Sequence, residues 1–582
     1  MADTLSTNRL LAVLLGGLLA FGCSSGSVDG EDDGAAEDDG GNDGADDGGG
    51  NGGNGAPVIT ITSPERGTVS TADSVEVSGR VTGSGSISQV TINGNAAELA
   101  SDGSFTANLA LEEGITLIET VARDDAGRES TDARGVLAGN LVDQSTPVTE
   151  GLVANMSGTA MTGLSGMIQD FANNTDFTAL ATSLNPVVNT GDGCNSAKVF
   201  VESVQHEGVD VGAGPVAGGI AADVSVRNLT VTGRVTFRAV CVSGSADFTL
   251  TADGFNLTGT ITPTLTGGDI NVGLNGVANS FSGFAIDVSG IPGFVESLFT
   301  GAVRDQLSNI LRDTITNMVP TVANGFLSDF LADSYSISIL GQTISLSVTP
   351  SAMNWTEQGG TIVLDTSSTV DAAEGALYLS SPRPRPGDAD LASTGIRIAV
   401  ADDVLNQLLG SIWASGALED TVLPLPGDAL SAAFGGDVQS AAVTMILPPV
   451  ANFDTSTGTA KLTIADLQMD ASSPSGEVLA SFVLSAEIDL AVETSADGRV
   501  RIVTRAPRIL AQVLSQSDSL LTELTADKVA AIAELGISQV SLLADDLLGS
   551  IPVPGIAGAT ITSPTFQPVG GYLLLGGDIA FE

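Results

Sequence analysis

Between residues 139 and 582, the sequence repeats one order of elements: an amphipathic helix, a long alternating tract, further helices and a strand. Apolar residues recur every three to four positions in "MTGLSGMIQDFA" and in "ADDVLNQLLGSIWASGAL", as in helices that bury one face. Residues 199–287 and 441–504 instead alternate apolar and polar residues, which is typical of strands with one buried face. Because this order occurs twice, the sequence predicts two similar modules that combine helices and strands.

The prolines of "SSPRPRPGDADL" mark an extended connector between the modules. We therefore expect a first module at residues 139–380, a linker at 381–391 and a second module at 392–582. The first module contains a further helical segment, "IPGFVESLFTGAVRDQLSNILRDTITNMV", and the second contains "ISQVSLLADDLLGSIP" before the last strand.

The apolar bands on these helices are wide, whereas aromatic residues make up only 4% of the chain. A helix that lies on a sheet needs one apolar stripe. Wider bands can border an apolar slot for an acyl chain, in which each buried CH2 contributes ~0.8 kcal/mol. The alternative is that these residues are ordinary core, the commoner role for any single apolar helix position. The candidate slot-lining residues are Met161, Leu164, Ile168, Phe171, Phe299, Val303, Leu307, Ile310, Leu405, Leu408, Leu409, Ile412, Trp413, Val540, Leu543 and Leu547.

Residues 56–138 have a different character. Short apolar or alternating runs such as "VITITSP" and "DSVEVSGRV" are separated by Gly, Asn and Asp, which predicts an all-β sandwich. The stretches "ITSP", "VSGRV", "TINGN" and "ARDDAGR" resemble bacterial immunoglobulin-like domains of cell-surface proteins. This resemblance implies a spacer or an adhesive module.

The amino-terminal segment predicts export. Arg9 precedes an apolar run over residues 10–21 that is shorter than the ~20 residues of a spanning helix, so residues 1–22 read as a secretory signal peptide. The stretch "LLAFGC" resembles the lipobox of bacterial lipoproteins, although Phe21 departs from the pattern. The resemblance implies a lipid anchor on Cys23, and Ser24 after it implies passage to the outer membrane, on either its periplasmic or its surface face. The alternative is an ordinary signal peptide with a chance cysteine.

Gly and Asp dominate residues 23–55, so we expect a solvated, flexible tether there. The whole chain has 21 basic and 69 acidic residues, for a formal net charge of -48. This excess repels nucleic-acid phosphates and argues against docking on anionic lipids by charge alone.

The chain offers little for catalysis. It has a single histidine, His206, so it cannot form a site that needs two histidines, and it contains no P-loop. We therefore expect no enzyme activity, no metal and no cofactor. An enzyme would have to work with carboxylates alone.

The end of the chain, "IPVPGIAGATITSPTFQPVGGYLLLGGDIAF", resembles the bactericidal/permeability-increasing and lipid-transfer proteins of the tubular lipid-binding superfamily. The segments "FVESLFTGAVRDQLSNIL" and "ISLSVTP" and the Pro-rich connector follow in the same order, so the resemblance covers residues 155–582. It implies a boomerang of two barrels, each a highly curved antiparallel sheet with packed long helices, around a shared central sheet that includes the last strand. Each barrel would hold a phospholipid.

Two departures from this family concern cysteine and charge. The family disulfide joins a strand to the long helix, but no cysteine lies between residues 291 and 319. Cys194 and Cys241 could pair instead in an oxidising compartment, or remain a buried unpaired couple. The few basic residues make the cationic tip of the endotoxin binders unexpected here.

The leading hypothesis is a lipid-anchored envelope protein that binds phospholipid or another acyl-chain lipid for transport or sensing. The alternative is a cell-surface adhesin or structural scaffold with closed barrels. The sequence leaves the oligomeric state open.

Overall fold

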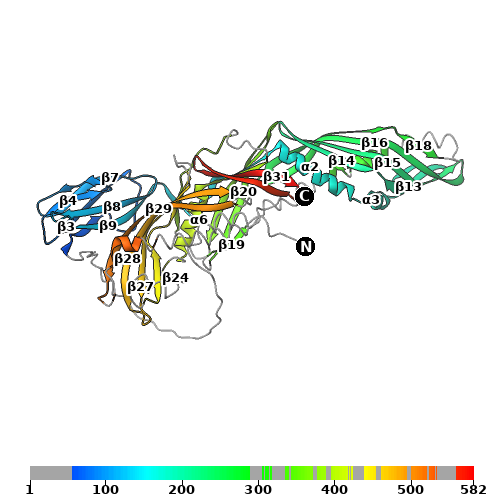
Figure 1. The fold of residues 1–582 in the computed structure, drawn as a ribbon. Helices are drawn as coiled ribbons and strands as arrows, with labels where there is room; N and C mark the ends of the chain where they lie inside the picture. Colours follow the sequence, from blue (N-terminus) through cyan, green and yellow to red (C-terminus); the bar gives the residue numbers. More distant parts are fainter. Residues whose placement is uncertain are drawn as a thin grey trace.

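The computed structural model describes a set of ranges separated by gaps: residues 55–288, 304–306, 308–313, 315–317, 335–339, 342–370, 376–387, 395–416, 419, 421–423, 438–453, 460–494, 500–518, 520, 524–530, 533 and 559–581. The expected signal peptide, the anchor residue Cys23 and nearly all of the tether lie outside them. No helix within these ranges is both long and apolar enough to cross a membrane. The described chain is mostly β-strand, with few helices (Figure 1).

Two sheets form a sandwich at the amino-terminal end. One contains, in spatial order, β1 (Val58–Ser63), β3 (Ser74–Thr82), β7 (Ser104–Ala110) and β6 (Glu98–Leu99). The other contains β2 (Thr68–Ser70), β9 (Glu129–Ala138), β8 (Gly114–Asp124), β4 (Ile87–Ile92) and β5 (Asn95–Ala96). Val77 and Phe105 of the first sheet meet Val90 and Ile118 of the second in one buried core.

The first module is built on a curled sheet with two very long strands. Its strands are β12 (Val188–Asp192), β13 (Asn195–Gln205), β14 (Gly208–Val216), β15 (Gly219–Ala239), β16 (Val242–Thr266), β17 (Asp269–Ser282) and β18 (Ala285–Val288). Strand β15 pairs with β13, β14 and β16, and β16 also pairs with β17 and β18. Two helices, α2 (Gly158–Asn173) and α3 (Phe177–Ser183), pack against β14 and β13.

A central sheet joins the two modules. Its order is β19 (Tyr335–Ile339), β20 (Gln342–Thr356), β21 (Gly359–Val370), β11 (Val148–Ser157), β23 (Ile396–Ala401), β31 (Tyr572–Phe581) and β30 (Ala559–Val569). Strand β11, from before the connector, pairs on one side with β21 and on the other with β23, from after it. The last strand, β31, lies inside this sheet and buries Tyr572 and Leu574. The apolar end of the chain is therefore covered by both modules.

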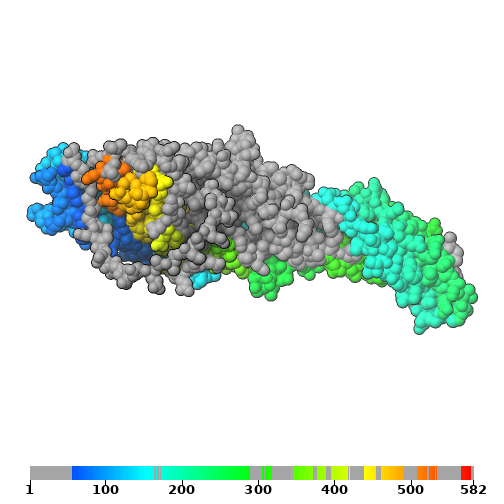
Figure 2. All heavy atoms as spheres, turned by 90° about the horizontal axis from the view of Figure 1, so that it is seen from below, coloured from blue at the N-terminus to red at the C-terminus, as the bar shows by residue number. Residues whose placement is uncertain are grey.

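The second module contains its own sheet, here called the third sheet because it follows the curled and central sheets, and a buried helix. The sheet runs β24 (Thr421–Leu423), β25 (Ser440–Met445), β27 (Ala460–Ser472), β28 (Val478–Thr494) and β29 (Val500–Gln516), with β26 (Val450–Asn452) also on β27. Helix α6 (Asp402–Ala414) lies in a core shared by this sheet and the central sheet. A small sheet pairs β10 (Leu141–Asp143) with β22 (Leu377–Leu379). The molecule is elongated, with the sandwich at one end and the curled sheet at the other (Figures 1 and 2).

The described helices are shorter than the long packed helices that the family resemblance implied. Helices α2, α3 and α6 have 16, 7 and 13 residues. The run "NNTD" interrupts the first helical stretch, because its Asp176 accepts a hydrogen bond from the Ala179 N–H and starts α3 as a separate helix. The long segment expected from residue 292 is described only at 304–306, 308–313 and 315–317, all helical.

The sandwich packs directly on the second module. Leu117 and Leu137 of the sandwich share a buried cluster with Ala465 and Leu510 of the third sheet. Strand β9 contacts β27, β28 and β29. The sandwich is thus fixed to its neighbour by an apolar interface.

Candidate functional site

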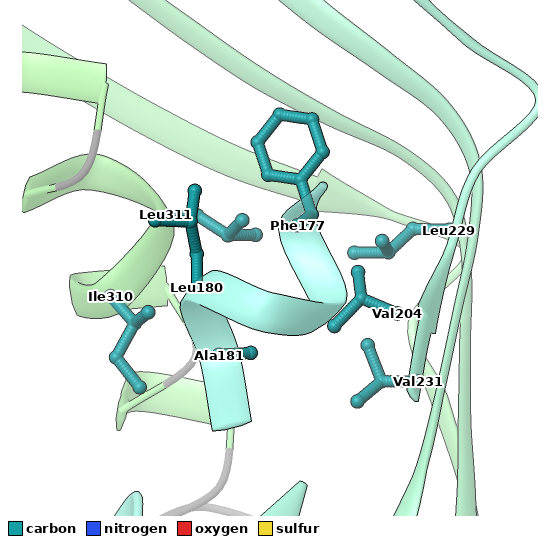
Figure 3. Close-up of a pocket in the computed structure, with 8 residues that line it drawn as sticks. All are labelled: Phe177, Leu180, Ala181, Val204, Leu229, Val231, Ile310 and Leu311. Atoms are coloured by element: carbon teal, nitrogen blue, oxygen red, sulfur yellow. The ribbon is translucent and has the colours of Figure 1, made fainter. Parts of the chain in front are cut away.

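An apolar cavity lies between α3 and the curled sheet of the first module (Figure 3). It has a volume of about 20 Å³, room for about one water-sized sphere. Helix α3, strands β13 and β15, and the helical segment 308–313 supply its walls. The lining residues are Phe177, Leu180, Ala181, Val204, Leu229, Val231, Ile310 and Leu311.

The sheet side of the cavity follows from alternation along β15. Leu229 and Val231 are each 1% exposed and face inward, while Thr230 between them and Thr232 after them are partly exposed. This alternation places aliphatic side chains on one face of a half-buried strand. All the lining side chains are apolar, so the cavity suits hydrocarbon and offers nothing to a charged ligand.

Helix α3 is held on the sheet by one hydroxyl group. The Thr178 Oγ1 donates to the Val204 carbonyl oxygen at 3.0 Å and accepts from the Val204 N–H at 2.9 Å. Phe177 and Ala181, one turn apart, are both buried against the sheet. Leu180 lines the cavity although 41% of its surface is exposed, so the cavity reaches the protein surface beside it.

The single histidine lies beside this cavity. His206 follows β13 directly, and its ring stands edge-on to Phe177 with centroids 5.3 Å apart. Its Nδ1 is buried without a hydrogen-bond partner, and desolvation lowers the pKa of the ring. A neutral imidazole packed on a phenyl ring fits an apolar surrounding.

The structure places only some of the residues predicted for the first slot. Ile310 lines the cavity, and Met161 is 1% exposed in the helix before α3. The side chains of Leu164, Ile168, Phe171, Phe299, Val303 and Leu307 lie outside the part that the structure describes.

Sequence reasoning missed the sheet side of the cavity and α3 itself. The signals were present: inward residues alternate in "NLTVTGRV", and "FTALA" spaces Phe177, Leu180 and Ala181 at helical intervals.

The candidates of the second module occupy its core. Leu405, Leu408, Leu409 and Ile412 are at most 3% exposed and pack among residues of the central and third sheets. Trp413 is partly buried, and its indole N–H donates to the Met445 carbonyl oxygen at 2.7 Å. Val540, Leu543 and Leu547 lie outside the described residues. In the described part of this module, α6 therefore contacts protein side chains on all sides.

Two adjacent carboxylates at the start of α6 are buried. The Asp402 side chain accepts from the Phe453 N–H at 3.1 Å, and the Asp403 side chain accepts from the Ser381 N–H at 2.7 Å. Burial raises the pKa of Asp402 to about 7 and also raises that of Asp403. Through these hydrogen bonds, the start of α6 binds both the connector, at Ser381, and the residue after β26, Phe453. The sequence signal was "ADDV" at a helix start, where carboxylates are favoured.

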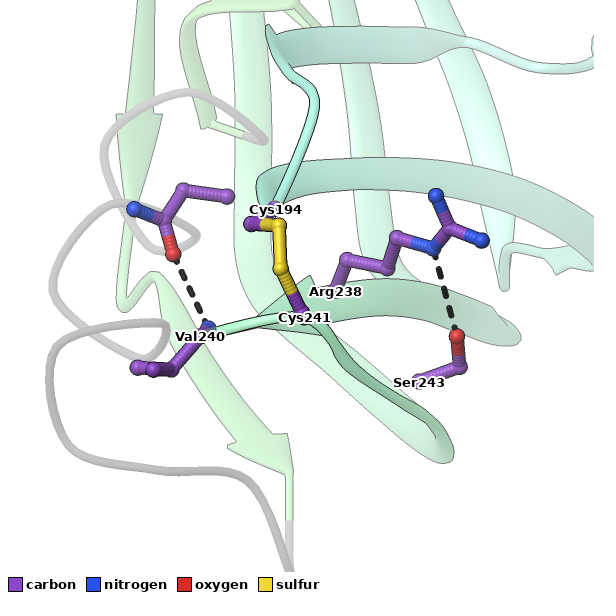
Figure 4. The surroundings of a disulfide bond; sticks show 6 residues. Cys194, Arg238, Val240, Cys241 and Ser243 are labelled. Carbon is purple, nitrogen blue, oxygen red and sulfur yellow. Dashed lines mark hydrogen bonds between the residues drawn. A yellow bond between two sulfur atoms is a disulfide. The ribbon is translucent and has the colours of Figure 1, made fainter.

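The described residues contain no group of three or more His, Cys, Asp or Glu side chains that could hold a metal ion. The two cysteines left open by the sequence form a disulfide, Cys194–Cys241 (Figure 4). It joins the turn between β12 and β13 to the turn between β15 and β16, so it links strand ends rather than a strand and a helix.

Residues 57–139 match the family described as glucodextranase, domain B. A search of curated proteins finds no match to the chain. Among solved structures, a lipopolysaccharide binding protein aligns with 75% of this chain and 100% of its own, at 13% identity and a TM-score of 0.39. P47 of Clostridium botulinum E1 aligns with 75% of this chain and 100% of its own, at 8% identity and a TM-score of 0.23. The family match covers the sandwich alone.

Proposed function

We propose that this chain binds acyl-chain lipids in apolar space between the helices and curled sheets of its modules. In this proposal the modules form a two-barrel boomerang, and a lipid on Cys23 holds the protein at the bacterial outer membrane. The protein would carry or sense the lipid and perform no reaction on it. The sandwich would be an immunoglobulin-like unit that sets the position of the barrels.

The observation that carries the proposal is the apolar cavity beside α3. Its walls come from separate elements: α3 is fixed to β13 by Thr178, while Ile310 and Leu311 belong to another helical segment. The present volume admits no acyl chain, so binding requires the segment 308–313 to move away from α3. Each CH2 that enters would contribute ~0.8 kcal/mol toward the cost of that movement.

The exposed leucines of α3 support an entry point. Leu180 lines the cavity and is 41% exposed, and Leu184, just after the helix, is 52% exposed. Large aliphatic side chains at the mouth of an apolar cavity give an incoming chain a continuous apolar path.

The test is organic extraction of the purified full chain followed by mass spectrometry, together with titration of a fluorescent fatty-acid probe. We expect co-purified lipid and saturable probe binding. Val204→Phe should fill the cavity and reduce both signals. Val211→Phe is the matched control, because Val211 packs against the same core from β14 but does not line the cavity.

Absence of both lipid and probe binding in the wild-type chain would contradict the proposal and favour the adhesin or scaffold alternative. Equal binding by the wild-type chain and Val204→Phe would show that the lipid does not bind in this cavity.

A further inference from the structure

The far end of the curled sheet carries two strongly exposed valines. Val240 is 79% exposed and Val242 is 70% exposed, and they flank Cys241 in the turn between β15 and β16. Most exposed turns carry polar residues or glycine. Two aliphatic side chains at such a place point to an apolar contact partner.

The backbone conformation of this turn is unfavourable for Val240. Val240 has φ 49° and Cys241 has φ 67°, so both residues of a two-residue hairpin turn have positive φ. Such turns favour Asn-Gly or similar pairs, and a β-branched residue is strained there. The chain thus keeps an apolar side chain at the apex against local conformational preference, as functional sites often do.

Two turns are joined into one rigid tip (Figure 4). The Cys194–Cys241 disulfide links them, and the Cys241 N–H donates to the Cys194 carbonyl oxygen at 3.2 Å. The Val240 N–H donates to the Asn195 side-chain oxygen at 3.1 Å. We define the tip as residues 192–195 and 239–243. Because it is already ordered, its valines lose little conformational freedom on contact.

Within the described residues, the tip lies at the end of the curled sheet that is far from the central sheet. At the base of β15, the Gly218 N–H donates to the Trp355 carbonyl oxygen of β20 in the central sheet. Strand β15 then runs for 21 residues, which at ~3.3 Å per residue puts its far end roughly 65 Å along the strand from that sheet. The sandwich lies at the opposite end of the molecule (Figure 1).

The charge near the tip differs from that of the chain. Residues 188–202 and 232–248 contain three basic and three acidic residues, which cancel, whereas the whole chain has a net charge of -48. Arg234 and Asp247 in this region form an ion pair at 2.8 Å. A neutral region escapes the repulsion from phosphate head groups that the acidic chain otherwise experiences.

We propose that this disulfide-linked tip inserts Val240 and Val242 into the interface of a phospholipid bilayer. A neutral, rigid, apolar apex fits the boundary between head groups and acyl chains, where the strength of binding rises with the apolar area buried. The inference goes beyond the proposed function, because it holds whether or not a lipid enters the cavity.

The test is flotation with phosphatidylcholine vesicles. It uses the full chain with Cys23→Ser, so that no acyl anchor contributes. We expect this protein to float with the vesicles. Val240→Asn with Val242→Thr should lower the partition coefficient by about tenfold for each valine. Asn is tolerated at positive φ, so the variant should fold at least as well, and thermal unfolding checks this.

The matched control is Val478→Thr, at a valine of the third sheet that is 48% exposed. It should float like the parent protein. Val204→Phe should also float normally, which separates tip insertion from cavity binding. Failure of the parent protein to float would overturn the inference, as would equal flotation of the tip variant. Self-association that the tip variant abolishes, without vesicle binding, would instead identify a second copy of the chain as the partner.

Discussion

The Arg66 guanidinium of the sandwich donates to the Asp466 carboxylate of the second module at 2.8 Å, although the two residues are 400 positions apart. The Asp466 side chain is fully buried and also accepts from the N–H groups of Gly67 and Gly135. Arg66 further contacts Gln512 of β29. One carboxylate, at a bulge in β27, thus binds two separate segments of the sandwich.

We expect Arg66→Ala to destabilise this interface by ~3 kcal/mol or more, because it leaves the Asp466 carboxylate buried without its cation. Denaturant unfolding should show the sandwich separating earlier than in the wild-type chain. Arg80→Ala is the control, because the Arg80–Asp102 pair is more than half exposed and its loss should change the free energy of unfolding by at most ~0.5 kcal/mol. Equal effects of the two variants would mean that the buried pair adds nothing to docking.

The stability of the second module should fall as pH rises toward 7. Burial raises the pKa of Asp402 from 3.8 to about 7, so the folded protein keeps a proton that the unfolded chain releases near pH ~4. Stability from this group is full below about pH 4 and is lost as pH rises, by up to ~1.4 kcal/mol per unit. Asp402→Asn should therefore gain stability relative to the wild-type chain between about pH 4 and 7.

The measurement for Asp402 is the free energy of unfolding at several pH values in both proteins. Asp102→Asn is a control with the opposite sign, because hydrogen bonds from Ser104 lower the pKa of that exposed carboxylate. Parallel pH profiles for Asp402→Asn and the wild-type chain would refute the assignment.

Removing the disulfide should destabilise the first module. Cys194 and Cys241 are 47 positions apart, and a loop of that size corresponds to roughly 2–4 kcal/mol. We expect the double Cys→Ser variant to unfold at lower denaturant concentration. A reducing agent should shift the wild-type chain to the same midpoint and leave the variant unaffected. A wild-type midpoint insensitive to reduction would exclude a stabilising disulfide.

Thr178→Val should loosen α3 from the sheet. The change leaves the Val204 N–H and carbonyl groups without their side-chain partner, at a cost of ~1–3 kcal/mol. Thr182→Val is the control, because the Thr182 hydroxyl bonds only to backbone oxygens within α3. Comparable denaturant midpoints for the two variants would show that Thr178 does not anchor the helix.

Patterns that depend on local periodicity were predictable from the sequence. The alternation of residues 199–287 marked a region that folds into long strands, and the apolar run at residues 572–575 marked a buried strand. Side-chain periodicity also identified α6, because its leucines recur at helical spacing. It could not tell whether the helix borders a slot or a packed core, since both require the same apolar face.

Features that depend on tertiary contacts were not predictable. Asp466 has φ 51° in a strand bulge, and its buried carboxylate is compensated by Arg66 and by the N–H groups of Gly67 and Gly135, all from the sandwich. The pairing of Cys194 with Cys241 depends on which strand ends meet, which spacing alone does not fix.

The pairing of β11 with β23 has a consequence for dividing this protein into parts. A cut at the connector would remove β23, β30 and β31 from the central sheet and leave the β11 backbone without one of its two neighbours. An unprotected row of N–H and carbonyl groups recruits foreign strands and promotes aggregation. The two modules should therefore be expressed and purified together, as one chain.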